Sequence, residues 1–432
     1  MSSATRIAFR EDWLKSGAIA RLLQRMNEGT EPTGSGAISL KAGDHRDLFF
    51  LLADCIVMPG ELARSDISHL SHRAFINLRK NGPVTPPKLL SEISERVNHL
   101  LSVPSKTFTM WTAFRVRMDI DARGSRFRID DVRINLYRNL PKWLCLQEHF
   151  ISGVGRINPN SILNYYYLVC NTTARNENQA SDKIFRACDT FYASINTAWR
   201  TTEFFAQRHS TAKILPGPYQ FLFEGQKFLG TDKVWYTPNF DEDEWCRSPK
   251  SASDFARQSN TIRKVLSRLQ RHPLRTQLEK ALVFSSEGMM SKDLSFRLMR
   301  FWSAAEALFT SEADRTNSKK LIDRMVFAER ENREISRMKL ERAYILRNLY
   351  VHHGSTDNDD NSLTENLRET ILIFAFYILF NGEDIATHSD LLMMLDLPSD
   401  QSALAIRRQA IDRRLRLIQT GRHRADALTE VQ

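Results

Sequence analysis

The chain has 432 residues, with 61 Lys and Arg against 51 Asp and Glu, which gives a formal net charge of +10. Hydrophobic residues make up 42% of the chain and Gly and Pro are few, which excludes long disordered or collagen-like segments. The chain is too long for one ordinary hydrophobic core, so we expect two folded domains. The surplus of positive charge suits an anionic partner such as nucleic acid.

Membrane and disulfide features are not expected. The longest uninterrupted apolar run, residues 371–380, is about half as long as a membrane-spanning helix. The N-terminus reaches charged residues at once and lacks the apolar stretch of a secretory signal. The 5 cysteines are scattered without a close pair, which indicates free thiols. We therefore expect a cytoplasmic protein with no membrane partner.

The first half of the chain mixes predicted helices with predicted strands. Helices are expected over 47–58 and 88–101. Alternating apolar residues then predict a strand over 114–120, a turn at Gly124 and a returning strand whose change of phase at Asp130-Asp131 predicts a β-bulge. A strand near 164–170, a helix near 184–199 and a hairpin over 216–236 complete the α+β domain that we expect over residues 1–245.

The second half is predicted to be helical. Residues 246–254 have the composition of a linker, and strand signals stop beyond them. We expect an all-α domain over 255–385 and a basic helical extension over 386–432. The predicted helices of this half lie at 255–272, 278–285, 293–309, 319–329, 334–353, 363–380 and 403–419. The apolar end at 371–380 must be buried centrally or at a subunit interface.

The first helix of the second half is basic on one side. Lys264, Arg268 and Arg271 fall opposite Val265 and Leu269 at 100° per residue. Two interpretations remain open, a solvated face that happens to be basic and a track for an RNA backbone. Replacing the three basic residues is expected to leave the fold intact, because they point away from the apolar side.

The helix predicted over 334–353 carries a cluster of polar residues in its last turns. A helical projection places Met338, Ile345, Leu346 and Leu349 toward the core. Tyr344, Asn348 and His352 follow one another at four-residue spacing and form a polar stripe beside that face, while Arg347 lies about 140° from His352.

The angle between Arg347 and His352 favours a composite site. A straight helix does not easily bring both side chains onto one phosphate, whereas a second copy related by a two-fold axis supplies the missing partner. Histidine suits proton transfer near neutral pH, and arginine offers a fixed positive fork to a phosphate. Asn348 is placed to orient either the imidazole or a substrate oxygen. The sequence therefore predicts a homodimer.

The string Tyr-x-x-Arg-Asn-x-x-x-His-His-Gly, which begins at Tyr344, resembles the signature of the HEPN superfamily, in which Arg is followed by four to six residues and then His. The segment FWSAAEALF, residues 301–309, makes the chain most similar to the Apea-like HEPN group. The resemblance covers 255–385 and implies a HEPN helical bundle. By the family spacing His352 is the catalytic histidine, and His353 is a supporting residue. Family analogy makes Glu306 a partner for Arg347, although a structural pairing of Glu306 with another Arg stays open.

The resemblance also implies an activity. Catalytic members of the family are metal-independent endoribonucleases that act as dimers, and many are toxins or effectors of bacterial anti-phage defence. We therefore expect RNA cleavage at Arg347, Asn348 and His352 without a cofactor, with Tyr344 as a packing residue that has a polar tip. The other expected partner is an inhibitor or an activating phage component, and the N-terminal domain is expected to be a sensor or regulator. The competing interpretation is a non-catalytic HEPN interaction or nucleotide-binding module.

A metal site is not expected. Asp66, His69 and His72 are close in sequence, but no neighbouring Cys or Glu completes a ligand set.

Overall fold

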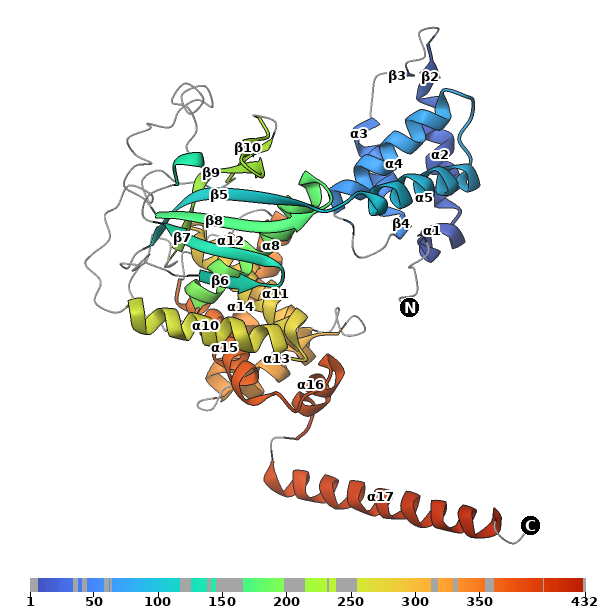
Figure 1. Ribbon diagram of the computed structural model, residues 1–432. Coiled ribbons are helices and arrows are strands. Elements are labelled where there is room, and N and C mark those ends of the chain that lie inside the picture. Colours follow the sequence, from blue (N-terminus) through green and yellow to red (C-terminus); the bar gives the residue numbers. More distant parts are fainter. Residues whose placement is uncertain are drawn as a thin grey trace. The chain divides into compact units, whose positions relative to one another are not determined.

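The computed structural model describes residues 7–33, 38–40, 45–57, 62, 64–116, 126–137, 141–144, 166–197, 214–230, 233–237, 255–311, 318–328, 333–353, 361–398 and 400–429. The chain divides into two compact units, each with its own core (Figure 1). The N-terminal unit contains residues 1–115, 121–188 and 216–240. The C-terminal unit contains residues 116–120, 189–215 and 241–432.

The N-terminal unit begins with five helices and two small antiparallel sheets. These are α1 (Glu11–Lys15), α2 (Ala18–Glu28), α3 (His45–Asp54), α4 (Arg64–Arg79) and α5 (Pro86–Ser102), with β1 (Ala8–Phe9) paired to β4 (Ile56–Val57) and β2 (Thr30–Pro32) paired to β3 (Ile38–Leu40). The helix predicted over 47–58 ends earlier, at Asp54, because the chain then extends as β4 beside β1. The helix predicted over 88–101 is confirmed and starts at the two prolines that precede Lys88.

A seven-stranded antiparallel sheet follows, in the order β10-β9-β5-β8-β7-β6 with β11 also paired to β9 (Figure 1). Its strands are β5 (Lys106–Val116), β6 (Arg126–Ile129), β7 (Val132–Tyr137), β8 (Tyr166–Ala174), β9 (Ile214–Glu224), β10 (Lys227–Phe228) and β11 (Val234–Tyr236). The predicted hairpin over 216–236 is confirmed as β9 with its two short partners. The strand predicted from residue 114 is only the end of β5, and Gly124 lies outside the described residues.

The β-bulge predicted at Asp130-Asp131 is wrong. Ile129 pairs with Val132, so the two aspartates form the tight turn of the hairpin between β6 and β7. Asp130 has a φ of 52°, the left-handed conformation that two-residue hairpin turns require. The apolar residues change phase here because the chain reverses direction, not because a residue is inserted into a strand.

Helix α8 (Glu177–Thr197) is shared between the units, which replaces the single boundary expected near residue 245. Its second half belongs to the C-terminal unit. There Asn196 accepts a hydrogen bond from the Ile214 backbone N–H at 2.9 Å and donates one to Ser286 Oγ at 2.8 Å, while Thr190 Oγ1 donates to Glu279 at 2.5 Å. The predicted linker, 246–254, lies outside the described residues.

Cys55, Cys170 and Cys188 are buried, and no disulfide involves them within the described residues. The Sγ atoms of Cys170 and Cys188 nevertheless lie 3.5 Å apart, a proximity that their sequence separation did not indicate. Cys145 and Cys246 lie outside the described residues.

The C-terminal unit confirms the predicted helical half of the chain. Its helices are α10 (Phe255–Arg271), α11 (Arg275–Met290), α12 (Leu294–Phe309), α13 (Ser318–Ala328), α14 (Arg333–His353), α15 (Asn361–Asn381), α16 (His388–Leu395) and α17 (Gln401–Thr429). Asp293 caps α12 by accepting from the N–H groups of Ser295 and Phe296. Helices α11 and α12 approach closely at Gly288, where a Cβ would lie 2.7 Å from the Phe301 ring.

Helices α12 and α15 form the centre of this unit. Phe309 of α12 stacks on Phe374 of α15 with ring centroids 4.8 Å apart. Most of the apolar run at 371–380 is buried against neighbouring helices, which confirms central burial as one of the two expected environments. Ile373 and Tyr377 are 39% and 49% exposed, and Phe376 and Phe380 are half-buried. Among the described residues no helix is both long and apolar enough to cross a membrane.

Candidate active site

The residues singled out on α14 meet α12 near the C-terminal ends of both helices. The buried face of α14 is formed by Leu340, Ala343 and Leu346, which join the core of the C-terminal unit. This packing places the next polar residues, Arg347 and Asn348, at the border between core and solvent.

Arg347 has one hydrogen-bond acceptor and one ion-pair partner. Its Nη1 donates to Asn348 Oδ1 at 3.0 Å, and its Nη2 lies 3.8 Å from Glu306 Oε1 of α12. The Arg347 side chain is 28% exposed, and its buried Nε has no hydrogen-bond partner among the described residues. The guanidinium is therefore fixed on the side of Glu306 while N–H donors remain for an anionic ligand.

Trp302, which sequence reasoning did not select, orients Glu306. Its Nε1 donates to the same Glu306 Oε1 at 3.0 Å, and its side chain is almost completely buried. The Trp302 ring also packs against the Tyr344 ring, with centroids 5.5 Å apart. The sequence could have indicated this contact, because Trp302 and Glu306 are four residues apart and therefore share one helix face.

Tyr344 links this cluster to α13. Hydrogen bonds with Ser318 and Asn348, together with the nearby Arg347 charge, lower the pKa of the Tyr344 hydroxyl. The residue therefore packs with its ring and makes polar contacts with its tip, in agreement with the role expected for it. Tyr344 and Arg347 together fix both sides of the Asn348 amide.

The two histidines lie beyond this cluster. His352 is exposed, and within the described part of the chain no hydrogen bond or ion pair joins it to Arg347. Arg347 and His352 are five residues apart, and this separation corresponds to a rotation of about 140° around α14. His353 is the last residue of α14, and its side chain lies outside the described part of the structure.

The outer side of α14 carries a mostly apolar stripe, and sequence reasoning assigned three of its residues to the core. Met338, Ile345 and Leu349 are 64%, 48% and 41% exposed, and only Leu346 of the four predicted core residues is buried. Ile335 extends the stripe toward the start of the helix with 53% exposure. We call Ile335, Met338, Arg342, Ile345 and Leu349 the α14 stripe. Its steps of three and four residues are those of a helix–helix interface, and the next step reaches His352.

The basic residues of α10 have different environments. Lys264 is exposed, and exposed Arg271 donates to Ser267 of its own helix. Arg268 instead donates to the Phe380 carbonyl at 3.0 Å and to Glu383 at 2.8 Å, and it lies 5.0 Å from the centre of the Phe380 ring. Arg268 thus ties α10 to the end of α15, a contact that the expectation of an intact fold after its replacement did not take into account.

Asp66, His69 and His72 lie in the N-terminal unit. Asp66 is buried and accepts hydrogen bonds from the Asn176 and Asn178 amides. The His72 ring packs against Phe49 at 4.1 Å, and burial lowers the pKa of both His69 and His72. Among the described residues no group of three His, Cys, Asp or Glu side chains is arranged to hold a metal ion.

A scan of the chain against protein-family models finds no match, and searches of curated proteins and of solved structures find none either.

Proposed function

We propose that the C-terminal unit is a HEPN-type, metal-independent endoribonuclease whose site consists of Arg347, Asn348 and His352. The observation that carries the proposal is the contrast between the two key residues. Arg347 is anchored by Glu306 and Asn348 and is partly exposed, whereas His352 stands exposed on the same helix in line with the α14 stripe. The intact Arg-Asn-x-x-x-His string and the surplus of positive charge support it.

The proposed reaction uses groups that the site contains. The 2′-oxygen of a ribose forms a bond to the adjacent phosphorus as the bond from phosphorus to the 5′-oxygen breaks, leaving a 2′,3′-cyclic phosphate and a 5′-hydroxyl. His352 gives a proton to the departing 5′-oxygen, and water takes the proton that the 2′-hydroxyl loses. The Arg347 guanidinium stabilises the negative charge that grows on the non-bridging oxygens, and Asn348 holds that guanidinium in place.

The α14 stripe supports a homodimer. Apolar side chains that are about half exposed at heptad spacing favour packing against another helix, and a second copy presents the same surface across a two-fold axis. His352 lies at the end of the stripe, so the interface brings the His352 of one protomer toward its partner. One protomer then supplies Arg347 and the other His352.

The setting of the enzyme follows from the family resemblance. We propose a cytoplasmic toxin or anti-phage effector that acts on RNA, with the N-terminal unit as its sensor or regulator and a phage component or inhibitor as its controlling partner. The separate cores of the two units support this division of roles, because each can respond to its own ligand.

The test is cleavage of total RNA by purified protein. Arg347→Ala and His352→Ala are each expected to abolish cleavage and to leave the melting temperature and the oligomeric state unchanged, while His353→Ala keeps most of the activity. Loss of the proton-transfer group alone corresponds to about 10²–10⁴-fold in rate. Cleavage is expected to persist in EDTA. If both alanine variants cut RNA like the wild type, or if EDTA stops cleavage, the proposed mechanism is wrong.

A further inference from the structure

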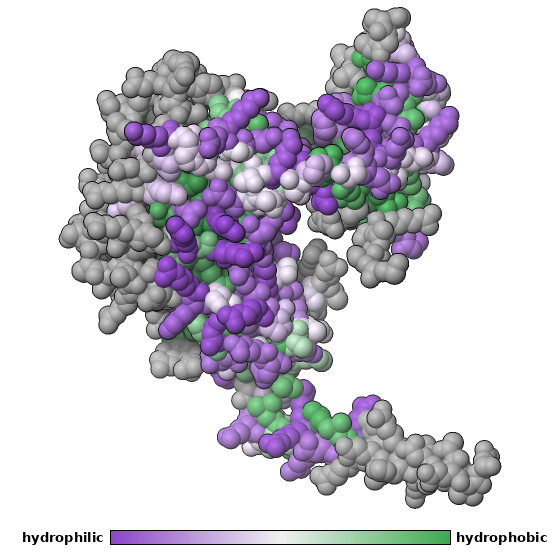
Figure 2. Space-filling model, viewed as in Figure 1, coloured by the Kyte–Doolittle hydropathy of each residue, from purple (hydrophilic) through white to green (hydrophobic). Residues whose placement is uncertain are grey.

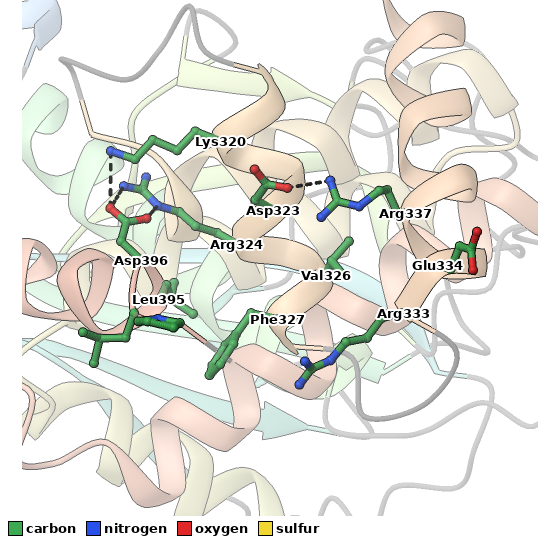
Figure 3. A pocket seen from close by; sticks show the side chains of 12 residues that line it. Lys320, Asp323, Arg324, Val326, Phe327, Arg333, Glu334, Arg337, Leu395 and Asp396 are labelled. Carbon is green, nitrogen blue, oxygen red and sulfur yellow. Dashed lines mark hydrogen bonds and ion pairs between the residues drawn. The ribbon is translucent and has the colours of Figure 1, made fainter. Parts of the chain in front are cut away.

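A cavity of about 720 Å³ lies at a different place in the C-terminal unit, between α13, the first two turns of α14 and the end of α16 (Figure 3). Buried Val326 and Leu395 and half-buried Phe327 form its apolar part. Charged side chains surround them, and the volume is in the range of pockets that hold small organic ligands. The cavity therefore suits a ligand with both a flat apolar ring and a charged group.

One side of the cavity is a fixed ion-pair network. Arg324 is 2% exposed, donates to both carboxylate oxygens of Asp396 at 2.7 Å and donates to the Phe309 carbonyl at 2.7 Å. Lys320 reaches the same carboxylate at 3.3 Å. Two cations thus cover Asp396, and its negative charge does not repel an anion in the cavity.

On the opposite side of the cavity, a second carboxylate is paired with a cation. Arg337 of α14 binds Asp323 of α13 at 2.5 Å through one of its nitrogens (Figure 3). The Lys320 and Arg337 side chains are 37% and 38% exposed, so both remain accessible from the cavity. Both side chains therefore bring positive charge to a phosphate that enters the cavity.

Arg333, Phe327 and Glu334 also line the cavity, together with Leu397 and Pro398. Within the part of the chain that the structure describes, no ion pair involves Arg333, and its guanidinium is directed from α14 toward the Phe327 ring (Figure 3). A phenyl ring and a guanidinium plane are the two protein groups on which nucleic-acid bases stack. The pair thus offers a stacking place beside the cations.

We infer that this cavity binds a nucleotide, with its base between Phe327 and Arg333 and its phosphate on Lys320 and Arg337. The residues lie outside the proposed cleavage site, so the inference does not depend on the nuclease activity. The nucleotide comes either free in solution or as one unit of a bound RNA strand. Both sources present the same ring and phosphate, and the experiment separates them.

The test is calorimetric titration of the full-length protein with 5′-AMP and 5′-UMP and with an oligoribonucleotide carrying 2′-O-methyl groups, which removes the attacking hydroxyl. Phe327→Leu keeps an apolar side chain without a ring, and Arg333→Gln removes an exposed charge. Each is expected to weaken nucleotide binding by about ten-fold or more. Lys339→Gln, an exposed residue of α14 that does not line the cavity, is the control and should bind like the wild type.

The two probes distinguish the source of the ligand. Saturable binding of the mononucleotides that depends on Phe327 and Arg333 identifies a free nucleotide, whereas such dependence for the oligonucleotide alone identifies an RNA strand. The inference is overturned if neither probe responds to the two substitutions, or if ribose 5-phosphate binds as tightly as 5′-AMP. RNA cleavage does not enter these readouts, so the inference can fail while the proposed ribonuclease stands, and the reverse.

Discussion

Glu306 of α12 and Arg347 of α14 meet at 3.8 Å, and the same Glu306 oxygen accepts the indole N–H of buried Trp302 at 3.0 Å. The indole therefore sets the position of a carboxylate that in turn sets the position of a partly exposed guanidinium. A hydrogen bond from a buried ring holds its acceptor in one position, because the ring cannot change rotamer without disturbing the core. Trp302 is thus expected to act on the proposed reaction through Arg347.

Trp302→Phe tests this relay. The substitution keeps an aromatic ring against Tyr344 but removes the donor to Glu306, so the proposed RNA cleavage should lose about ten-fold in kcat with little change in KM. Steady-state cleavage of a short oligoribonucleotide measures both constants. A change in KM alone would show that Trp302 affects RNA binding instead of the position of Arg347.

Trp111→Phe is the matched control. Trp111 is also buried, but its indole N–H has no hydrogen-bond partner among the described residues, and it lies on β5 in the N-terminal unit. Loss of that N–H should leave cleavage unchanged. If both Trp→Phe variants lose the same activity, the loss reflects a general effect on packing and the relay through Glu306 is wrong.

Ile345→Arg tests the proposed dimer. The side chain is 48% exposed in the single chain, so a charge there leaves the fold of one protomer intact but places two like charges across the α14 stripe. The variant should be a monomer by light scattering and inactive on RNA. Met393→Arg changes an apolar residue on α16 that is 60% exposed and lies outside the stripe, and this variant should stay dimeric and active. A wild-type mass close to 49.9 kDa at all concentrations would contradict the dimer itself.

The basic side of α10 divides into two predictions. Replacing Lys264 and Arg271 with Gln should weaken RNA binding by a similar factor for all sequences and reduce its salt dependence, because a protein with fewer phosphate contacts releases fewer counterions from the RNA.

Arg268→Gln should instead lower the melting temperature, because it removes the contacts with Phe380 and Glu383. Fluorescence titrations at several salt concentrations and thermal melts check both. Unchanged salt dependence in the double variant would mean that this face is only solvated.

Asp189 gives a pH dependence of stability. Although part of this residue is exposed, burial of its carboxyl group, with Glu287 and Glu279 of α11 nearby, raises the pKa of Asp189 to about 7. The unfolded chain releases this proton near pH 3.8, so between these values the folded state binds more protons and stability falls as the pH rises. Asp189→Asn should therefore melt higher than the wild type at about pH 8 and approach it below about pH 5. An equal difference at both pH values would contradict this assignment.

Local signals were sufficient for most of the helical half of the chain. Pro273 ends the α10 segment, Asp293 caps α12, and the predicted 334–353 helix differs from α14 by one residue at its start. In these cases a single side chain or a missing N–H determines where a helix begins or ends. The polar cluster of Tyr344, Arg347 and Asn348 was likewise selected from spacing within one helix.

Features that depend on other parts of the chain could not be predicted in the same way. The projection of α14 ranked faces by hydrophobicity, but the buried face is the one with Ala343, and Ile345 is left outside. The hairpin turn at Asp130 produced the same change of phase as a bulge. The division of α8 between two units follows from long-range contacts such as that of Asn196 with Ser286.

The composite site is tested most directly by mixing two inactive variants. Arg347→Ala and His352→Ala protein, each inactive alone, are combined under conditions that exchange protomers, and RNA cleavage is measured. A site built from Arg347 of one protomer and His352 of its partner is intact once in each mixed dimer, so random exchange should restore about a quarter of wild-type activity. A mixture that stays as inactive as its components, although mass measurements show mixed dimers, would contradict the composite site.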